Sequence, residues 1–450
     1  MQIEQAPHSG KAPWVWLSLQ ILGVALFLAL RGNFTVEHVK DSPDYLNFPW
    51  DSTTAIFGHF RTPAYPAFLE ISKLLESDNR AVPACQFLIY AGSVLIFFHG
   101  LRRLTGENAA ALIAASSFLY ANILHGYVAT IATDTLAASC GVAAMGLLAW
   151  MLAGGGTAVK ASLAVVVMLS WLIRPAYLFL PAAVVLIGMF LVIRRHGLFH
   201  RELLRSGTCL IALTFGPLLG YSLLRLVLVG HMGIVSFGGY SLVGITGQLL
   251  DPSIAATLSP EVRPIAETAL IHRDQIVAEA GWSGESPLNY ARLEAMYNPV
   301  LWDVFLPAAK SVYGDDHQRI NDAMKEIAEQ TLRHRPKDYA IYLVKASRQA
   351  VKKILWDIAN NPAYLLLILV GAAIWFLTLV LGIPGTPSQN IAVTGIMSVI
   401  YTITSLACVI PACPPIGRMT DASGVFIPVV LASIIWRIGA DLRRRKVAAH

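Results

Sequence analysis

The sequence contains few charged residues. Aspartate, glutamate, lysine and arginine make up 14% of its 450 residues, and the mean hydropathy is +0.57. An average soluble chain has about 25% charged residues. The apolar residues are also gathered into long blocks, as in transmembrane helices. This composition excludes a soluble globular protein and predicts an all-α polytopic membrane protein.

The sequence also lacks the cysteine and histidine spacings of a zinc site and any recognisable nucleic-acid-binding motif. The five cysteines form no CxxC pair and show no Cys/His ligand spacing. The net charge of +6 arises mostly from lysine and arginine in short loops, which orient membrane helices, so we expect no nucleic acid partner. Cys85 and Cys413 both fall near the expected outer face, which leaves a disulfide between them open.

Long apolar runs dominate what is present. Because about 20 apolar residues cross a bilayer, we expect about ten spans, and we interpret the first as a retained signal-anchor. The predicted spans are 13–31, 84–101, 108–124, 135–153, 161–173, 177–193, 207–229, 362–382, 391–410 and 422–438.

Basic residues orient these spans. With the N-terminus inside, the inner connections hold Arg102, Arg103, Lys160, the "RRHGLFHRELLR" segment and the terminal "RRRK", whereas the short outer connections hold only Arg174 and Arg418. Two long segments then fall outside, 32–82 and 230–360. We therefore expect an N-terminal membrane module (1–229) with a functional first outer loop, an extracytoplasmic loop with surface helices (230–360), and C-terminal spans (361–450).

Polar residues from separate segments gather at the predicted outer face. The first outer loop reads "VKDSPDYLNFPWDSTTAIFGHFRTPAYPAF", and later segments add an acid and two arginines near span ends. These residues are Asp41, Asp44, Asp51, His59, Arg61, Asp134, Arg174 and Arg418. A carboxylate among apolar walls can act as a general base, and arginine presents a donor fork suited to phosphate. A lone arginine such as Arg225 is expected to snorkel instead.

Short motifs in the first outer loop and in later segments resemble those of a known family. "DSPDYL" followed by "RTPAYPAFL" resembles the first extracytoplasmic loop of GT-C-fold glycosyltransferases, which include the protein O-mannosyltransferases and the bacterial lipid A aminoarabinose transferase. "ATDTLAASC", "LIRPAYLFLP" and "HRPKDYAIYLV" are similar to later motifs of that family, in the same order. The chain departs from it in having Ser42 after the first aspartate, Arg335 inserted between His334 and Pro336, and Arg418–Met419 where an arginine–tyrosine pair is common.

The resemblance implies a set of site residues. It makes Asp41 the catalytic base and Tyr45 the motif tyrosine, and it places Asp134 in the catalytic site. The substrate-binding residues that we expect are Asp44, Tyr45, His59, Arg61, Tyr65, Arg174 and Arg418. From the residues alone, Asp41 and Asp44 remain alternatives, since three residues apart on one helical face they would raise each other's pKa. Ser42 and Pro43 resemble a helix start that would place Asp44 at its N-terminus.

The resemblance also implies a reaction. We expect an inverting transfer of a sugar from a polyprenyl-phosphate carrier to an acceptor hydroxyl, at the periplasmic or outer face of a bacterial inner membrane. The acceptor is left open among lipid, glycan and protein, and membrane lipids are further partners. No cofactor is certain, and a divalent cation stays an open question.

Three other functions compete with this expectation. A transporter or flippase of lipid-linked or anionic substrates would use similar residues, but near the midplane of the bilayer. A glycan ligase would use a polyprenyl-diphosphate donor. A receptor-like structural protein would leave Asp134 and Arg174 without explanation.

Overall fold

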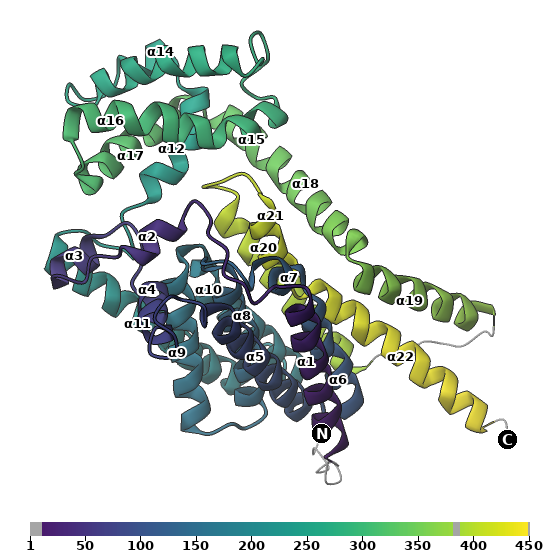
Figure 1. The fold of residues 1–450 in the computed structure, drawn as a ribbon. Coiled ribbons are helices and arrows are strands. Elements are labelled where there is room, and N and C mark those ends of the chain that lie inside the picture. The colour runs from purple at the N-terminus through teal and green to yellow at the C-terminus, as the bar shows by residue number, and fades with distance from the viewer. Residues whose placement is uncertain (1–10, 381–387, 449–450) are drawn as a thin grey trace.

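The structure is a computed structural model that describes residues 11–380 and 388–448. Within these ranges the chain is helical, with one isolated bridge between Glu37 and Thr130 and no strand. Figure 1 shows a helical bundle that carries the N-terminus at one end and a separate helical layer beyond the other end. The helices of the bundle are α1 (Ala12–Leu30), α5 (Val82–Thr105), α6 (Asn108–Ser116), η1 (Ser117–Tyr120), α7 (Asn122–Tyr127), α8 (Asp134–Leu152), α9 (Thr157–Ile173), η2 (Pro175–Leu178), α10 (Phe179–His196), α11 (Arg201–Val229), α20 (Gln389–Val409), α21 (Gly417–Gly424) and α22 (Ile427–Ala448).

Long apolar helices in this bundle indicate an integral membrane protein. By length and composition, eight helical stretches of the described residues can cross a bilayer, or nine if one bent pair counts as a span. This is fewer than the ten apolar runs of the sequence. The run 161–173 forms α9, whose 17 residues extend about 26 Å and end at Ile173, two residues before Pro175. The run 362–382 forms α19 (Pro362–Val380), which qualifies only with α18 (Pro336–Asn360), from which it bends by 86°; residues 381 and 382 lie outside the described ranges.

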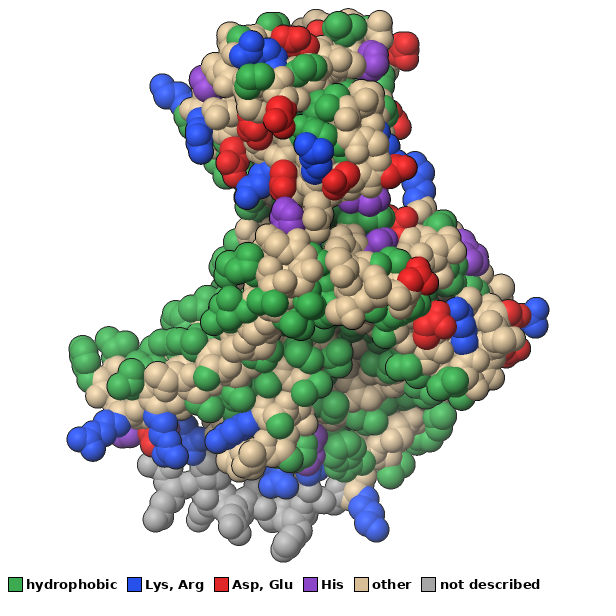
Figure 2. All heavy atoms as spheres, turned by 90° about the vertical axis from the view of Figure 1, so that its left-hand side faces the viewer, with side chains coloured by type: hydrophobic (Ala, Val, Ile, Leu, Met, Phe, Trp, Pro, Cys, Tyr) green, Lys and Arg blue, Asp and Glu red, His purple; other side chains and the backbone are tan. Residues whose placement is uncertain are grey.

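The distribution of side chains agrees with a membrane-embedded bundle. In Figure 2 a broad hydrophobic surface lies above a rim of lysine and arginine, and the layer at the other end carries both signs of charge. Basic residues at one edge of the apolar surface are what the positive-inside rule predicts for the cytoplasmic edge.

Close helix packing organises the centre of the bundle. α8 is buried over most of its length, and it packs against α5 through glycines. A Cβ added to Gly146 would lie 2.5 Å from the Cα of Phe97, and one added to Gly100 would lie 1.8 Å from the carbonyl oxygen of Gly146. Small residues allow membrane helices to approach this closely because they place no bulky side chain between the backbones. Such close packing matters in a membrane, where apolar side chains gain little from leaving lipid.

The layer beyond the bundle, which we call the upper lobe (residues 238–334), has a hydrophobic core of its own. Its helices are α12 (Gly238–Leu249), α13 (Pro252–Ala255), α14 (Arg263–Glu279), α15 (Tyr290–Asn298), the π-helix η3 (Pro299–Phe305), α16 (Leu306–Tyr313) and α17 (His317–His334). α12 and α17 touch at Gly239, where a Cβ would lie 2.0 Å from the carbonyl oxygen of Asn321. α18 then leads from the upper lobe back to the bundle (Figure 1).

Short helices of the first loop lie between the bundle and the upper lobe. They are α2 (Ser42–Leu46), α3 (Thr53–Gly58) and α4 (Ala64–Ser72). α2 starts one residue earlier than predicted, because the Ser42 hydroxyl does not cap the helix. It accepts a hydrogen bond from the Val39 N–H at 2.8 Å and donates one to the Ile131 carbonyl at 2.9 Å. Asp44 lies in the first turn of α2, as predicted.

Candidate functional site

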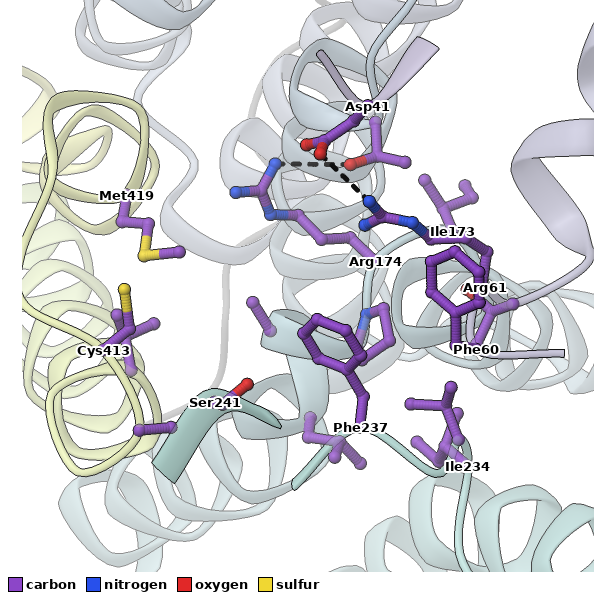
Figure 3. Close-up of a pocket in the computed structure, with 18 of the residues that line it drawn as sticks. Asp41, Phe60, Arg61, Ile173, Arg174, Ile234, Phe237, Ser241, Cys413 and Met419 are labelled. Atoms are coloured by element: carbon purple, nitrogen blue, oxygen red, sulfur yellow. Dashed lines mark hydrogen bonds and ion pairs between the residues drawn. The ribbon is translucent and has the colours of Figure 1, made fainter. Parts of the chain in front are cut away.

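A cavity of about 400 Å³ lies at the end of the bundle that faces the upper lobe. Five parts of the chain surround it: the first loop, the residues just before α8, the junction of α9 and α10, the segment that precedes and begins α12, and the end of α20 with the start of α21. Its walls are largely apolar. In Figure 3, Phe237 and Ile234 lie across the cavity from Asp41, and Cys413 and Met419 form one side.

Three arginines and one carboxylate interrupt these apolar walls. The predicted site residues that line the cavity are Asp41, Tyr45, Arg61, Arg174 and Arg418. The other four predicted residues lie behind its wall, namely Asp44, His59, Tyr65 and Asp134. The cavity therefore collects charged side chains from three segments far apart in the sequence.

Asp41 is held by two of the arginines. Arg61 Nη2 donates to Asp41 Oδ1 at 2.9 Å, and Arg418 Nη1 donates to Asp41 Oδ2 at 3.1 Å. Burial by itself would raise the pKa of Asp41, but the charges and hydrogen bonds of Arg61 and Arg418 outweigh it and lower that pKa below its usual value. The expectation that Asp41 and Asp44 raise each other's pKa is therefore wrong for Asp41, because a guanidinium lies between the two carboxylates.

Arg61 is the most firmly held of the three arginines. Its Nε and Nη2 donate to Asp44 Oδ2 at 3.2 and 2.8 Å, and its Nη1 lies 3.5 Å from the Tyr45 hydroxyl. Its guanidinium carbon also lies 5.1 Å from the centre of the Tyr45 ring and 5.2 Å from that of Phe60. Asp44 and the aromatic rings thus fix Arg61 in the cavity wall.

Arg174 pairs with Asp134, which lies behind the cavity wall. The sequence stops α9 here, since Pro175 follows and Arg174 takes the extended conformation usual before proline. Arg174 Nη1 donates to the Asp134 carboxylate and to Thr133 Oγ1, the latter at 3.3 Å. Asp134 is 2% exposed, so it orients Arg174 and does not face the cavity.

His59 and Tyr65 support the loop from behind. His59 Nδ1 accepts a hydrogen bond from the Arg61 N–H at 3.1 Å, and its ring packs against Phe48 and Phe60. Burial lowers the pKa of His59. Tyr65 is fully buried, with its ring 5.0 Å from that of Tyr45. These contacts position Arg61 and Tyr45.

Arg225 is buried, so the expectation that it snorkels is wrong. Its Nε donates to the Phe57 carbonyl at 2.8 Å, its Nη1 to the Gly233 carbonyl at 3.2 Å, and its Nη2 to Ser236 Oγ at 3.0 Å. It thereby connects the first loop to the segment 233–237, which forms the apolar wall. Gly233, at φ +116°, allows that segment to turn back onto Arg225.

The segment that carries Arg418 is held by side chains from the upper lobe and α18. Tyr342 donates to the Ile410 carbonyl at 2.8 Å, and Lys353 donates to the Pro415 carbonyl at 2.9 Å. The hydroxyls of Tyr339 and Tyr297 donate to the carbonyls of Pro411 and Ala412.

Cys413, in this segment, is a free thiol, and so is Cys85. The disulfide between them that the sequence left open therefore does not form.

The charged groups do not fit a divalent cation. Asp41, Asp44 and Asp134 each bind an arginine, and three guanidinium groups nearby would repel a cation. In the described ranges no three His, Cys, Asp or Glu residues form a group that could hold a metal.

Sequence reasoning missed the apolar wall. Ile234, Phe237 and Ser241 line the cavity. In the sequence, their segment is recognisable only as an apolar, glycine-rich stretch that follows a span.

Comparisons of the chain with protein-family models, with curated proteins and with solved structures found no match.

Proposed function

We propose that the protein is an inverting glycosyltransferase of the GT-C type, which uses a polyprenyl-phosphate sugar at the outer face of a bacterial inner membrane. One observation carries the proposal. A single cavity at the end of a membrane bundle combines a carboxylate, three arginines and apolar walls. These groups match a substrate that joins an anionic phosphate to a sugar and a hydrocarbon chain.

The reaction follows from this arrangement. Asp41 removes the proton of an acceptor hydroxyl, and the hydroxyl oxygen forms a bond to the anomeric carbon of the sugar. The bond from that carbon to the phosphate oxygen breaks, and its electron pair leaves with the polyprenyl phosphate. Attack from the face opposite the leaving group inverts the anomeric configuration.

The arginines stabilise the leaving group. The phosphate goes from one negative charge toward two as the bond breaks, and each well-placed cation in a water-poor site can contribute about 3 kcal/mol to the transition state. Arg174 and Arg418 each use one nitrogen, Nη1, in their bonds to carboxylates, which leaves further N–H groups for a phosphate. Arg61 already uses all three of its nitrogens.

The test uses the full-length protein in liposomes. The donors are polyprenyl-phosphate and polyprenyl-diphosphate hexoses and pentoses, labelled in the sugar, and an extract of envelope lipids and glycans supplies the acceptor. We expect label to leave the monophosphate lipid for a product, with release of polyprenyl phosphate. Label that crosses the bilayer on an intact lipid indicates a flippase, and transfer from the diphosphate donors alone indicates a ligase. Either result would overturn the proposal.

A further inference from the structure

Asp41 is not ready to act as a base in the structure. Each of its carboxylate oxygens accepts a hydrogen bond from a different arginine, Oδ1 from Arg61 and Oδ2 from Arg418. Two guanidinium groups favour the charged form of the carboxylate. A base in this state has little tendency to take a proton from a hydroxyl, so one of these contacts has to change before reaction.

The two arginines differ in how firmly they are held. Arg61 binds Asp44 and the Tyr45 hydroxyl as well as Asp41, and its side chain is 17% exposed. Arg418 has Asp41 as its one ion-pair partner among the described residues, through one nitrogen, and its side chain is 33% exposed. Arg418 is therefore the arginine that can leave Asp41 at the lower cost.

The backbone that leads to Arg418 is held by hydrogen bonds. The carbonyls of Ile410, Pro411, Ala412 and Pro415 accept hydrogen bonds from Tyr342, Tyr339, Tyr297 and Lys353. A rotation of the Arg418 side chain within the cavity is therefore enough, since both Asp41 and Arg418 line it.

We propose that Arg418 exchanges Asp41 for the phosphate of the donor, so that binding of the donor releases the catalytic base. This proposal rests on the proposed function. The charges of the three arginines that line the cavity are matched by those of Asp41 in its wall and of Asp44 and Asp134 behind it. A bound phosphate adds an anion, and Arg418 is the arginine that can give up its carboxylate for it, because Asp41 keeps Arg61 whereas the buried Asp134 pairs with Arg174. When the product phosphate leaves, Arg418 returns to Asp41.

The exchange has a consequence for the order of binding. Without donor, Asp41 keeps both arginines and does not deprotonate an acceptor. With donor, it keeps Arg61 alone and becomes a stronger base. Arg418 thus links activation of the acceptor to the presence of the sugar that will be transferred.

Infrared titration of Asp41 tests the exchange without turnover. The carboxyl band of Asp41 is identified as the one missing in Asp41→Asn, and it is titrated with and without polyprenyl monophosphate, whose binding is measured separately. We expect the ligand to raise the midpoint by about one pH unit, because one of two adjacent guanidinium groups is lost.

Three variants separate exchange from simple repulsion by the ligand. In Arg418→Gln the midpoint without ligand is already raised, and the ligand shifts it by less than half as much. Arg418→Lys, which keeps the charge, retains the larger shift and serves if the glutamine variant does not fold. Arg335→Gln removes another arginine–aspartate pair, to Asp251 on the upper lobe, and behaves as the parent.

The outcomes distinguish the two proposals. Binding of polyprenyl monophosphate without a shift, or with an equal shift in the parent and Arg418→Gln, overturns the exchange and leaves the proposed function intact. Absence of both binding and sugar transfer overturns the proposed function, and the exchange with it.

Discussion

Two carboxylate–arginine groups lie side by side at the cavity, and they differ in burial. Asp134 and Arg174 are buried, at 2% and 9% exposure, and form a single pair, with Arg174 in the cavity wall and Asp134 behind it. Asp41 lies in the cavity wall, about one quarter exposed, and shares two arginines. A buried ion pair is costly to break, because the charge that remains is neither paired nor solvated by water. The first group is therefore a fixed part of the wall, and the second is able to change partners.

Removal of the buried charge is expected to have the largest effect on stability. Asp134→Asn leaves Arg174 without its counter-ion and should lower the free energy of unfolding by about 3 to 5 kcal/mol. Asp41→Asn should change it by about 1 kcal/mol or less, since its partners are partly exposed and Arg61 keeps Asp44. Thermal unfolding of the two variants in one detergent measures the difference. Equal losses would contradict the division into a fixed and an exchangeable group.

Arg225 extends the fixed group to an arginine that donates to two backbone carbonyls and a hydroxyl. Arg225→Met leaves the Phe57 and Gly233 carbonyls without their donor and should cost about 3 kcal/mol of stability. It should also raise KM for the donor more than it lowers kcat, because the apolar wall at 234–237 loosens while Asp41 stays in place. Arg205→Met, on the exposed surface of the same helix, is the matched control, with an expected change of about 0.5 kcal/mol or less. An Arg225→Met protein as stable as the control would show that the buried contacts carry little energy.

His59 should have the smallest effect. His59→Phe keeps the ring packing against Phe48 and Phe60 but removes the acceptor of the Arg61 N–H, a loss of about 1 kcal/mol. Sugar transfer should stay within about fivefold of the parent. A loss of a hundredfold or more would mean that His59 contacts substrate, as expected from the sequence, and that the cavity wall extends further than its present lining.

The fold was predictable where hydrophobicity alone decides it. Long apolar runs predicted an all-helical membrane protein and the positions of most of its long apolar helices. The bend between α18 and α19 was not predictable, because an apolar run does not reveal its angle to the preceding helix. The buried contacts of Arg225 were missed for a similar reason, since its acceptors come from Phe57 and Gly233, the first of which is 168 residues away.

The sequence predicted the charged residues of the site but not the apolar residues that form its walls. Asp41, Arg61, Arg174 and Arg418 were expected to gather at one face, and all four line one cavity. Their pairing was not predicted, because the sequence gives no distances between loops. Asp134 was predicted to lie in the catalytic site and Asp44 to bind substrate, and in the structure they bind Arg174 and Arg61. Phe237 and Ile234 carry no chemical signal that distinguishes them from other apolar residues.

The most direct test of the account compares two aspartates of the first loop. Asp41 lines the cavity, whereas Asp51 is exposed and does not. The initial rate of sugar transfer from polyprenyl-phosphate donors is measured for Asp41→Asn and Asp51→Asn in liposomes, at equal amounts of folded protein. We predict that Asp41→Asn loses about 10² to 10⁴ in rate, as expected for a general base, and that Asp51→Asn transfers at the parent rate. Transfer by Asp41→Asn at the rate of Asp51→Asn would contradict the assignment of Asp41 as the base.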